Sequence, residues 1–135
     1  MSWRIAFRWL LVTFYTVAGV AHLNDPTPFL AITPGWVPFP REVILATGVC
    51  ELLGAVGLIV PVASRWAGIM LALYALCVFP ANIKHALDAL DGTGIPPTSW
   101  WYHGPRLLLQ PVIIWWALYV SGTTDWPFGR KAGRV

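Results

Sequence analysis

Four long apolar windows dominate the chain, at about residues 5–21, 43–60, 66–86 and 107–120. A helix needs about 20 mostly apolar residues to cross the hydrocarbon core of a bilayer, and these windows are close to that length. The pattern therefore predicts an all-α fold: one domain over residues 1–135, built as a bundle of four transmembrane helices.

The composition supports a membrane protein. The chain is 57% hydrophobic and 11% charged, whereas a soluble domain is typically about 25% charged. Nine tryptophans fit a membrane location, because indole rings favour the headgroup interface. The net charge is only +3 and the basic residues form no stripe, so a nucleic-acid partner is excluded. Membrane lipids are the expected surroundings.

The distribution of Lys and Arg predicts the orientation. The N-terminus, the short loop with Arg65 and the C-terminus hold six basic residues, and the opposite side holds three. The positive-inside rule then places both termini of this multi-pass cell-membrane protein in the cytoplasm. The first window follows two arginines, as a signal peptide does. Because AGVAHLND is a poor cleavage region, we expect this window to be retained.

Two elaborate loops fall on the outer side in this topology. The first reads HLNDPTPFLAITPGWVPFPRE, and the third reads DALDGTGIPPTSWWYHGPR. Proline disfavours helix interiors, and Trp and Phe favour the interface. We expect both Pro/Trp-rich loops to be short, stiff segments that cap the outer mouth of the bundle. The alternative is that they serve only as interfacial packing.

Polar residues gather at the outer ends of the four windows. Polar groups inside a membrane are costly, so they usually face the interior of a helix bundle. Four helices could thus contribute to one polar pocket beneath the loops. The candidate ligand-binding residues are His22, Glu51, Asn82, His85, Arg106 and Gln110.

Glu51 is the most informative of these residues. It lies about eight residues into the second window, on the face that also carries small residues such as Gly48 and Gly54. An intramembrane carboxylate is by default a functional candidate, and here it could carry protons. The alternative is a structural lock in which Glu51 pairs with Arg106, Gln110 or His85.

Haem, metal and thiol chemistry receive less support. His22 and His85 could face each other at similar depth, but the sequence has no tight metal-ligand spacing, so no metal site is predicted. Cys50 and Cys77 also lie at similar depth and could form a dithiol near Glu51. Two small side chains in helix packing are the simpler interpretation.

The ordered motifs resemble the DoxX-like family of small four-helix membrane proteins. They are GVAHL, FLAITPGWVPFP, TGVCELLGAVGLIVP, the AG…VFPANI run and RLLLQPVIIWW, and they extend from about residue 17 to 116. The family's recurring polar positions match His22, Glu51, Pro80, Asn82, Arg106 and Gln110. His85, His103 and the two cysteines lie outside that pattern.

The resemblance implies a membrane address and leaves the chemistry open. The family is named for subunits associated with a thiosulfate–quinone oxidoreductase, relatives are linked to oxidative-stress complexes, and a eukaryotic branch looks like receptor-assembly chaperones.

Two functions remain open from the sequence. The first is a redox-linked subunit that binds a quinone or similar lipid-soluble ligand, with the polar cluster supplying hydrogen bonds and protons. The sequence shows no motif for a redox cofactor, so a quinone-linked oxidoreductase activity requires an electron-donating partner. The second is a non-catalytic scaffold or assembly chaperone, which docks a client membrane protein or self-associates through small-residue helix faces.

Overall fold

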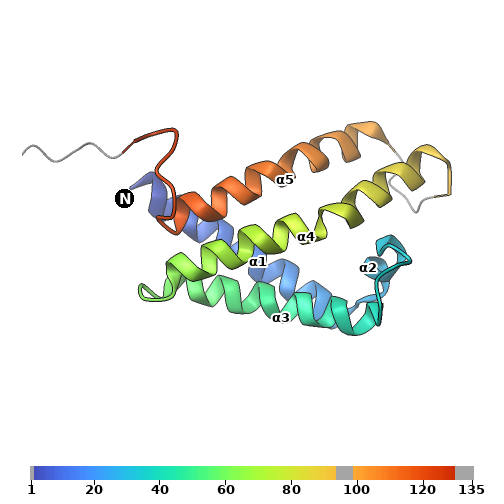
Figure 1. The fold of residues 1–135 in the computed structure, drawn as a ribbon, viewed down its shortest axis with the longest axis horizontal. Helices are drawn as coiled ribbons and strands as arrows, with labels where there is room; N and C mark the ends of the chain where they lie inside the picture. The colour runs from blue at the N-terminus through green and yellow to red at the C-terminus, as the bar shows by residue number, and fades with distance from the viewer. Residues whose placement is uncertain (1, 94–98, 130–135) are drawn as a thin grey trace, which may run out of the picture.

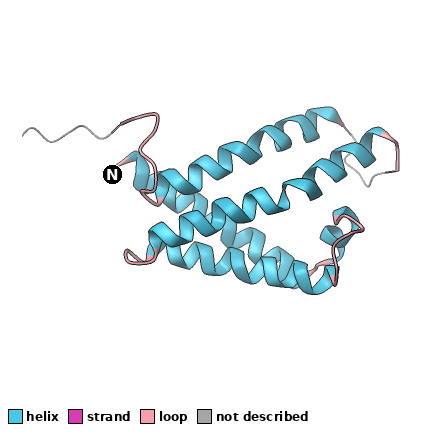
Figure 2. Ribbon diagram, viewed as in Figure 1, coloured by secondary structure: helices cyan, strands magenta, loops and turns pink. Residues whose placement is uncertain are grey.

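The computed structural model describes residues 2–93 and 99–129, which fold into helices joined by short loops (Figures 1 and 2). The helices are α1 (Trp3–Asn24), α2 (Thr27–Ile32), α3 (Pro40–Ile59), α4 (Ser64–Leu90) and α5 (Trp100–Val120). No strand occurs in the described ranges. The prediction of an all-α fold is confirmed for this part of the chain.

Three of these helices are long and apolar enough to cross a membrane, namely α1, α3 and α4. This finding indicates a membrane protein. Helix α5 is 21 residues long, but it is not among the three. It carries His103, Arg106 and Gln110 along its length, and these polar residues lower its hydropathy.

The long helices contact one another in the order α1–α3–α4–α5, and α5 returns to α1. Figure 1 shows the N-terminus, the α3–α4 turn and the segment after α5 at one end of the molecule. Helix α2, the end of α4 and the start of α5 lie at the other end (Figure 1). We call these the terminal end and the cavity end.

The core is small and the outer surface is apolar. Leu11, Leu58 and Leu71 are completely buried where the long helices meet. Large apolar side chains nevertheless cover the outside; Leu53 and Leu108 are 64% and 73% exposed. Soluble monomers rarely expose contiguous apolar surfaces of this extent, so the outer surface suits lipid.

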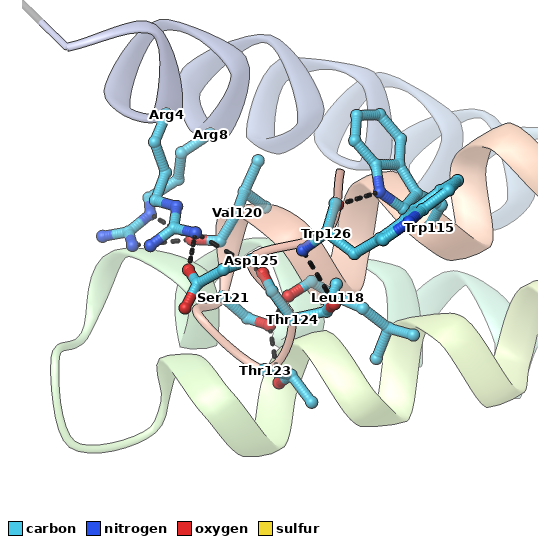
Figure 3. Close-up of polar contacts among 10 residues, drawn as sticks. All are labelled: Arg4, Arg8, Trp115, Leu118, Val120, Ser121, Thr123, Thr124, Asp125 and Trp126. Atoms are coloured by element: carbon cyan, nitrogen blue, oxygen red, sulfur yellow. Dashed lines mark hydrogen bonds and ion pairs between the residues drawn. The ribbon is translucent and has the colours of Figure 1, made fainter. Parts of the chain in front are cut away.

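Polar side chains fasten α1 to the segment that follows α5 at the terminal end (Figure 3). Arg4 Nη2 donates to Asp125 Oδ1 at 2.5 Å. Arg8 donates twice to the carbonyl oxygen of Val120, from Nε at 3.2 Å and from Nη2 at 2.7 Å. That carbonyl lies at the last residue of α5, where helices leave carbonyls without partners, so Arg8 caps α5.

The helices differ from the predicted windows mainly in the two loops. The first loop contains the short helix α2, which was not anticipated. Much of the predicted third loop is helical, because α4 continues to Leu90 and α5 begins at Trp100. Ser99 caps α5 by accepting a hydrogen bond from the Trp101 amide at 3.2 Å.

Some sequence-based predictions fall outside the described residues. Residues 94–98 include the proline pair of the third loop, and residues 130–135 include Arg130, Lys131 and Arg134, which counted toward the orientation. In the described part of the predicted third loop, only its last residue, Arg106, lines the cavity described below, and Arg106 lies within α5. Among the described residues, the cap over that cavity therefore comes from the first loop.

Candidate functional site: an apolar cavity with two polar walls

A cavity of about 350 Å³ lies at the cavity end, between the four long helices and beneath α2. Most of its lining is apolar or aromatic, including Phe29, Trp36 and Val78. The volume is within the range of small-molecule sites. The polar side chains in its lining are Tyr15, His22, Thr33, Thr47, Glu51, Tyr74, Asn82, Arg106 and Gln110.

One wall is built around Glu51, which is only 3% exposed. Tyr74 of α4 donates its hydroxyl to Glu51 Oε1 at 2.8 Å. His22 of α1 places Nδ1 2.9 Å from Glu51 Oε2. A buried carboxylate is costly without partners, and here α1 and α4 each supply one to the carboxylate of α3. We call Glu51, His22 and Tyr74 the carboxylate wall.

His22 also connects this wall to the cap. Its Nδ1 lies 2.8 Å from the carbonyl oxygen of Ala18, so one ring nitrogen faces both that oxygen and Glu51. The ring stacks on Phe29 of α2, with 3.8 Å between centroids and 20° between planes. The His22 ring therefore contacts both the carboxylate wall and α2, which also packs on α3 and α4.

The other wall joins α4 to α5. Asn82 Nδ2 donates to Gln110 Oε1 at 3.1 Å, and Arg106 Nη2 donates to Asn82 Oδ1 at 2.6 Å. Arg106 Nη1 also lies 2.7 Å from His85 Nδ1. Arginine can only donate, so His85 Nδ1 accepts and the ring proton resides on Nε2. We call Asn82, Gln110, Arg106 and His85 the amide wall.

Gln110 also reaches the α4 backbone. Its Nε2 donates to the carbonyl oxygen of Ala75 at 2.6 Å. Pro80 has no amide hydrogen and so removes the helical partner of the Leu76 carbonyl, one residue along. Gln110 therefore stabilises α4 beside the turn that Pro80 weakens.

The structure brings together the residues that the sequence singled out. Five of them line the cavity, namely His22, Glu51, Asn82, Arg106 and Gln110. The sixth, His85, is not part of the lining and contacts Arg106. The expected alternative partners of Glu51 were wrong. Its hydrogen bond and ion pair go to Tyr74 and His22, because the carboxylate faces the α1–α4 side of the cavity.

Two tyrosines of the site were not predicted as site residues. Tyr15 lies seven residues before His22 on the same helix face, and Tyr74 lies eight residues before Asn82. That spacing was the available signal. Both residues lie inside apolar windows, where an aromatic ring is usually packing.

Both Cys50 and Cys77 are free thiols, and Cys77 lines the cavity. Within residues 2–93 and 99–129, no group of three or more His, Cys, Asp or Glu side chains is placed to hold a metal ion.

The chain belongs to a family described as a domain of unknown function, DUF8561, whose model matches residues 11–121. The match covers all four long helices, in part or whole, and every residue of the two walls. No curated protein and no solved structure matches the chain.

Proposed function

We propose that this member of the DUF8561 family is a membrane protein that binds a quinone or a similar lipid-soluble ligand in its cavity, as a subunit of a redox-linked complex. One observation carries the proposal. An apolar cavity of about 350 Å³ has a carboxylate, a histidine and tyrosines on one wall, and a guanidinium with two amides on another. Few polar groups in an apolar pocket are typical of ligand sites.

The proposal includes a four-helix bundle in which α5 is the fourth span. Helix α5 is 21 residues long, and 21 residues of α-helix extend about 32 Å, enough to cross a bilayer core. Exposed Trp3 and Trp66 at the terminal end, and Trp36 and Trp101 at the cavity end, support two interfacial belts. The termini then face the cytoplasm and the cavity lies in the outer half of the membrane.

The two walls suit the chemistry of a quinone. A quinone presents two carbonyl acceptors, and its reduction to a quinol takes up two electrons and two protons. Arg106 has donors beyond the two it gives to Asn82 and His85, and so can bond a carbonyl oxygen. Glu51 and His22 can pass protons, and the two electrons come from a partner protein. The resemblance to the DoxX-like family supports this redox assignment. The relationship to that family is itself part of the proposal.

A second candidate function is a scaffold or assembly chaperone in which the amide wall is a structural lock. The observation in its favour is that Asn82 bonds both Gln110 and Arg106, while Gln110 also donates to the α4 backbone. A cluster of this kind fixes helix register without any ligand. A client membrane protein or a second copy would then dock on the outer surface.

The ligand-binding function and the structural lock can be distinguished by native mass spectrometry of gently solubilised protein, with lipid extraction and an absorbance spectrum of the same sample. The variants are Glu51→Gln and Asn82→Ala. Glu42→Gln is the matched control, because Glu42 is exposed in the first turn of the same helix. A quinone or defined lipid that is retained by wild type and Glu42→Gln, and lost from folded Glu51→Gln and Asn82→Ala, supports the binding site. Ligand-free wild type with unfolded variants supports the lock.

A further inference from the structure

Tyr15 carries a buried hydroxyl that no described residue satisfies. The residue is 2% exposed, and its hydroxyl oxygen has no hydrogen-bond partner within residues 2–93 and 99–129. Buried polar atoms nearly always have partners, and an unpaired one is destabilising. The Tyr15 hydroxyl therefore calls for a specific explanation.

Tyr15 belongs to the cavity lining, next to the carboxylate wall. Tyr15 lines the cavity together with Glu51 and Tyr74. The rings of Tyr15 and Tyr74 meet edge-on, with 6.3 Å between centroids. Tyr74 already donates its proton to Glu51, so the two tyrosines are not equivalent. Of these two tyrosines, only Tyr15 keeps a hydroxyl donor that no described residue uses.

We propose that the Tyr15 hydroxyl donates to a neutral carbonyl oxygen of the bound ligand. The inference rests on the proposed function, because it names the group that recognises the ligand in that cavity. It also narrows the ligand class. A carbonyl next to Glu51 is compatible with the carboxylate, whereas the head of a fatty acid is repelled there and is drawn to the Arg106 side. The ligand class is therefore a lipophilic molecule with a neutral carbonyl, of which an oxidised quinone is the example tested below.

Loss of the hydroxyl should change binding of a carbonyl ligand and leave the fold intact. The test measures the affinity of a decyl-substituted benzoquinone, isotopically labelled at its carbonyl carbons, for the full chain in micelles. Tyr15→Phe is compared with wild type and with Tyr119→Phe, because Tyr119 is similarly buried but lies outside this cavity. We expect Tyr15→Phe to bind about three- to tenfold more weakly, and Tyr119→Phe to bind as wild type does.

The infrared band of the labelled carbonyls gives a readout that a structural role would not change. Hydrogen bonding lowers a carbonyl stretching frequency, so the band in wild type should lie below that of the same quinone in empty micelles. It should rise in Tyr15→Phe and stay unchanged in Tyr119→Phe. Decanoate, which carries a carboxylate, should bind wild type and Tyr15→Phe equally.

The outcomes separate this inference from the proposed function. Absence of quinone binding to wild type overturns both. Equal quinone affinity and an equal band in wild type and Tyr15→Phe overturns the role of Tyr15 and leaves the binding site standing. If Tyr15→Phe does not fold, a wild-type band at the empty-micelle position still overturns the inference, because no donor then reaches the carbonyls. Removal of an unsatisfied hydroxyl should leave the ligand-free protein at least as heat-stable as wild type.

Discussion

Gly48 and His22 lie so close together that a side chain at position 48 would displace His22. A Cβ atom added to Gly48 would lie 2.9 Å from His22 Cβ, and 3.0 Å from the carbonyl oxygen of Gly19. The absence of a side chain at Gly48 therefore lets α1 approach α3 until His22 reaches Glu51. Close helix approach through small residues is a common device in membranes.

Gly48→Ala should disturb both packing and site. The added methyl must push His22 or the α1 backbone away, and we expect a loss of about 1–3 kcal/mol in stability. Thermal unfolding in detergent measures the loss. Gly104→Ala is the control, because a Cβ there meets nothing within 4 Å and alanine favours a helix. A Gly48→Ala protein as stable as Gly104→Ala would show that the close approach is dispensable.

Gln110 should stabilise the fold through two hydrogen bonds that connect α5 to α4. Gln110→Leu removes the donor to the Ala75 carbonyl and the acceptor for Asn82, so the half-buried Asn82 Nδ2 loses this acceptor and α4 loses a side-chain tie to α5. We expect a cost of about 1–3 kcal/mol in thermal or denaturant unfolding.

A double-mutant cycle of Asn82→Ala and Gln110→Ala separates their mutual contact from the rest. Because the two side chains bond directly, the effects should be non-additive by about 0.5–1.5 kcal/mol. Additive effects would mean that each amide acts alone, and would weaken the structural-lock alternative.

The two arginines at the terminal end should contribute unequally (Figure 3). Arg8 makes two charged hydrogen bonds to the Val120 carbonyl, and Val120 is fully buried. Arg8→Met should therefore cost about 1.5–3 kcal/mol. The Arg4–Asp125 pair is about 30% exposed, so Arg4→Met should cost no more than about 1 kcal/mol, and less at high salt. Chemical unfolding at two salt concentrations checks both, and an Arg4 effect equal to that of Arg8 would contradict the assignment.

The long helices and the polar site residues could be predicted from the sequence for physical reasons. The same reasons explain which residues could not be predicted. Apolar windows must be long to span a bilayer, so α1, α3 and α4 were recognisable. Polar residues such as Glu51 and Asn82 stood out because they are rare in such windows. Tyr15 and Tyr74 did not stand out, because a phenol in an apolar run is indistinguishable from packing until its hydroxyl is placed.

The hydrogen-bond partners of Glu51 and the start of α5 could not be predicted from the sequence either. That Glu51 pairs with His22 and Tyr74 depends on how close α1 comes to α3, which the Gly19–Gly48 contact sets. The start of α5 at Trp100 depends on capping by Ser99, within a segment whose prolines favoured a loop. Local patterns do not encode such three-dimensional choices.

The turn that leads into α2 should respond to acid. Hydrogen bonds from Thr27, first its hydroxyl and then its backbone N–H, hold the pKa of the exposed Asp25 carboxyl below its usual range. A lowered carboxyl pKa means that the turn is stabilised fully above the ordinary value, about 3.9. That stabilisation is lost as the pH falls through the lowered value.

Carbon-detected NMR titration of the Asp25 carboxyl tests this directly. In wild type the midpoint should lie below the ordinary value, and Thr27→Val should raise it, because the hydroxyl is the larger cause. Thr33→Val is the matched control, because Thr33 bonds the Phe29 carbonyl at the other end of α2. If Thr27→Val leaves the midpoint where it is and Thr33→Val moves it, the turn does not hold the Asp25 carboxylate.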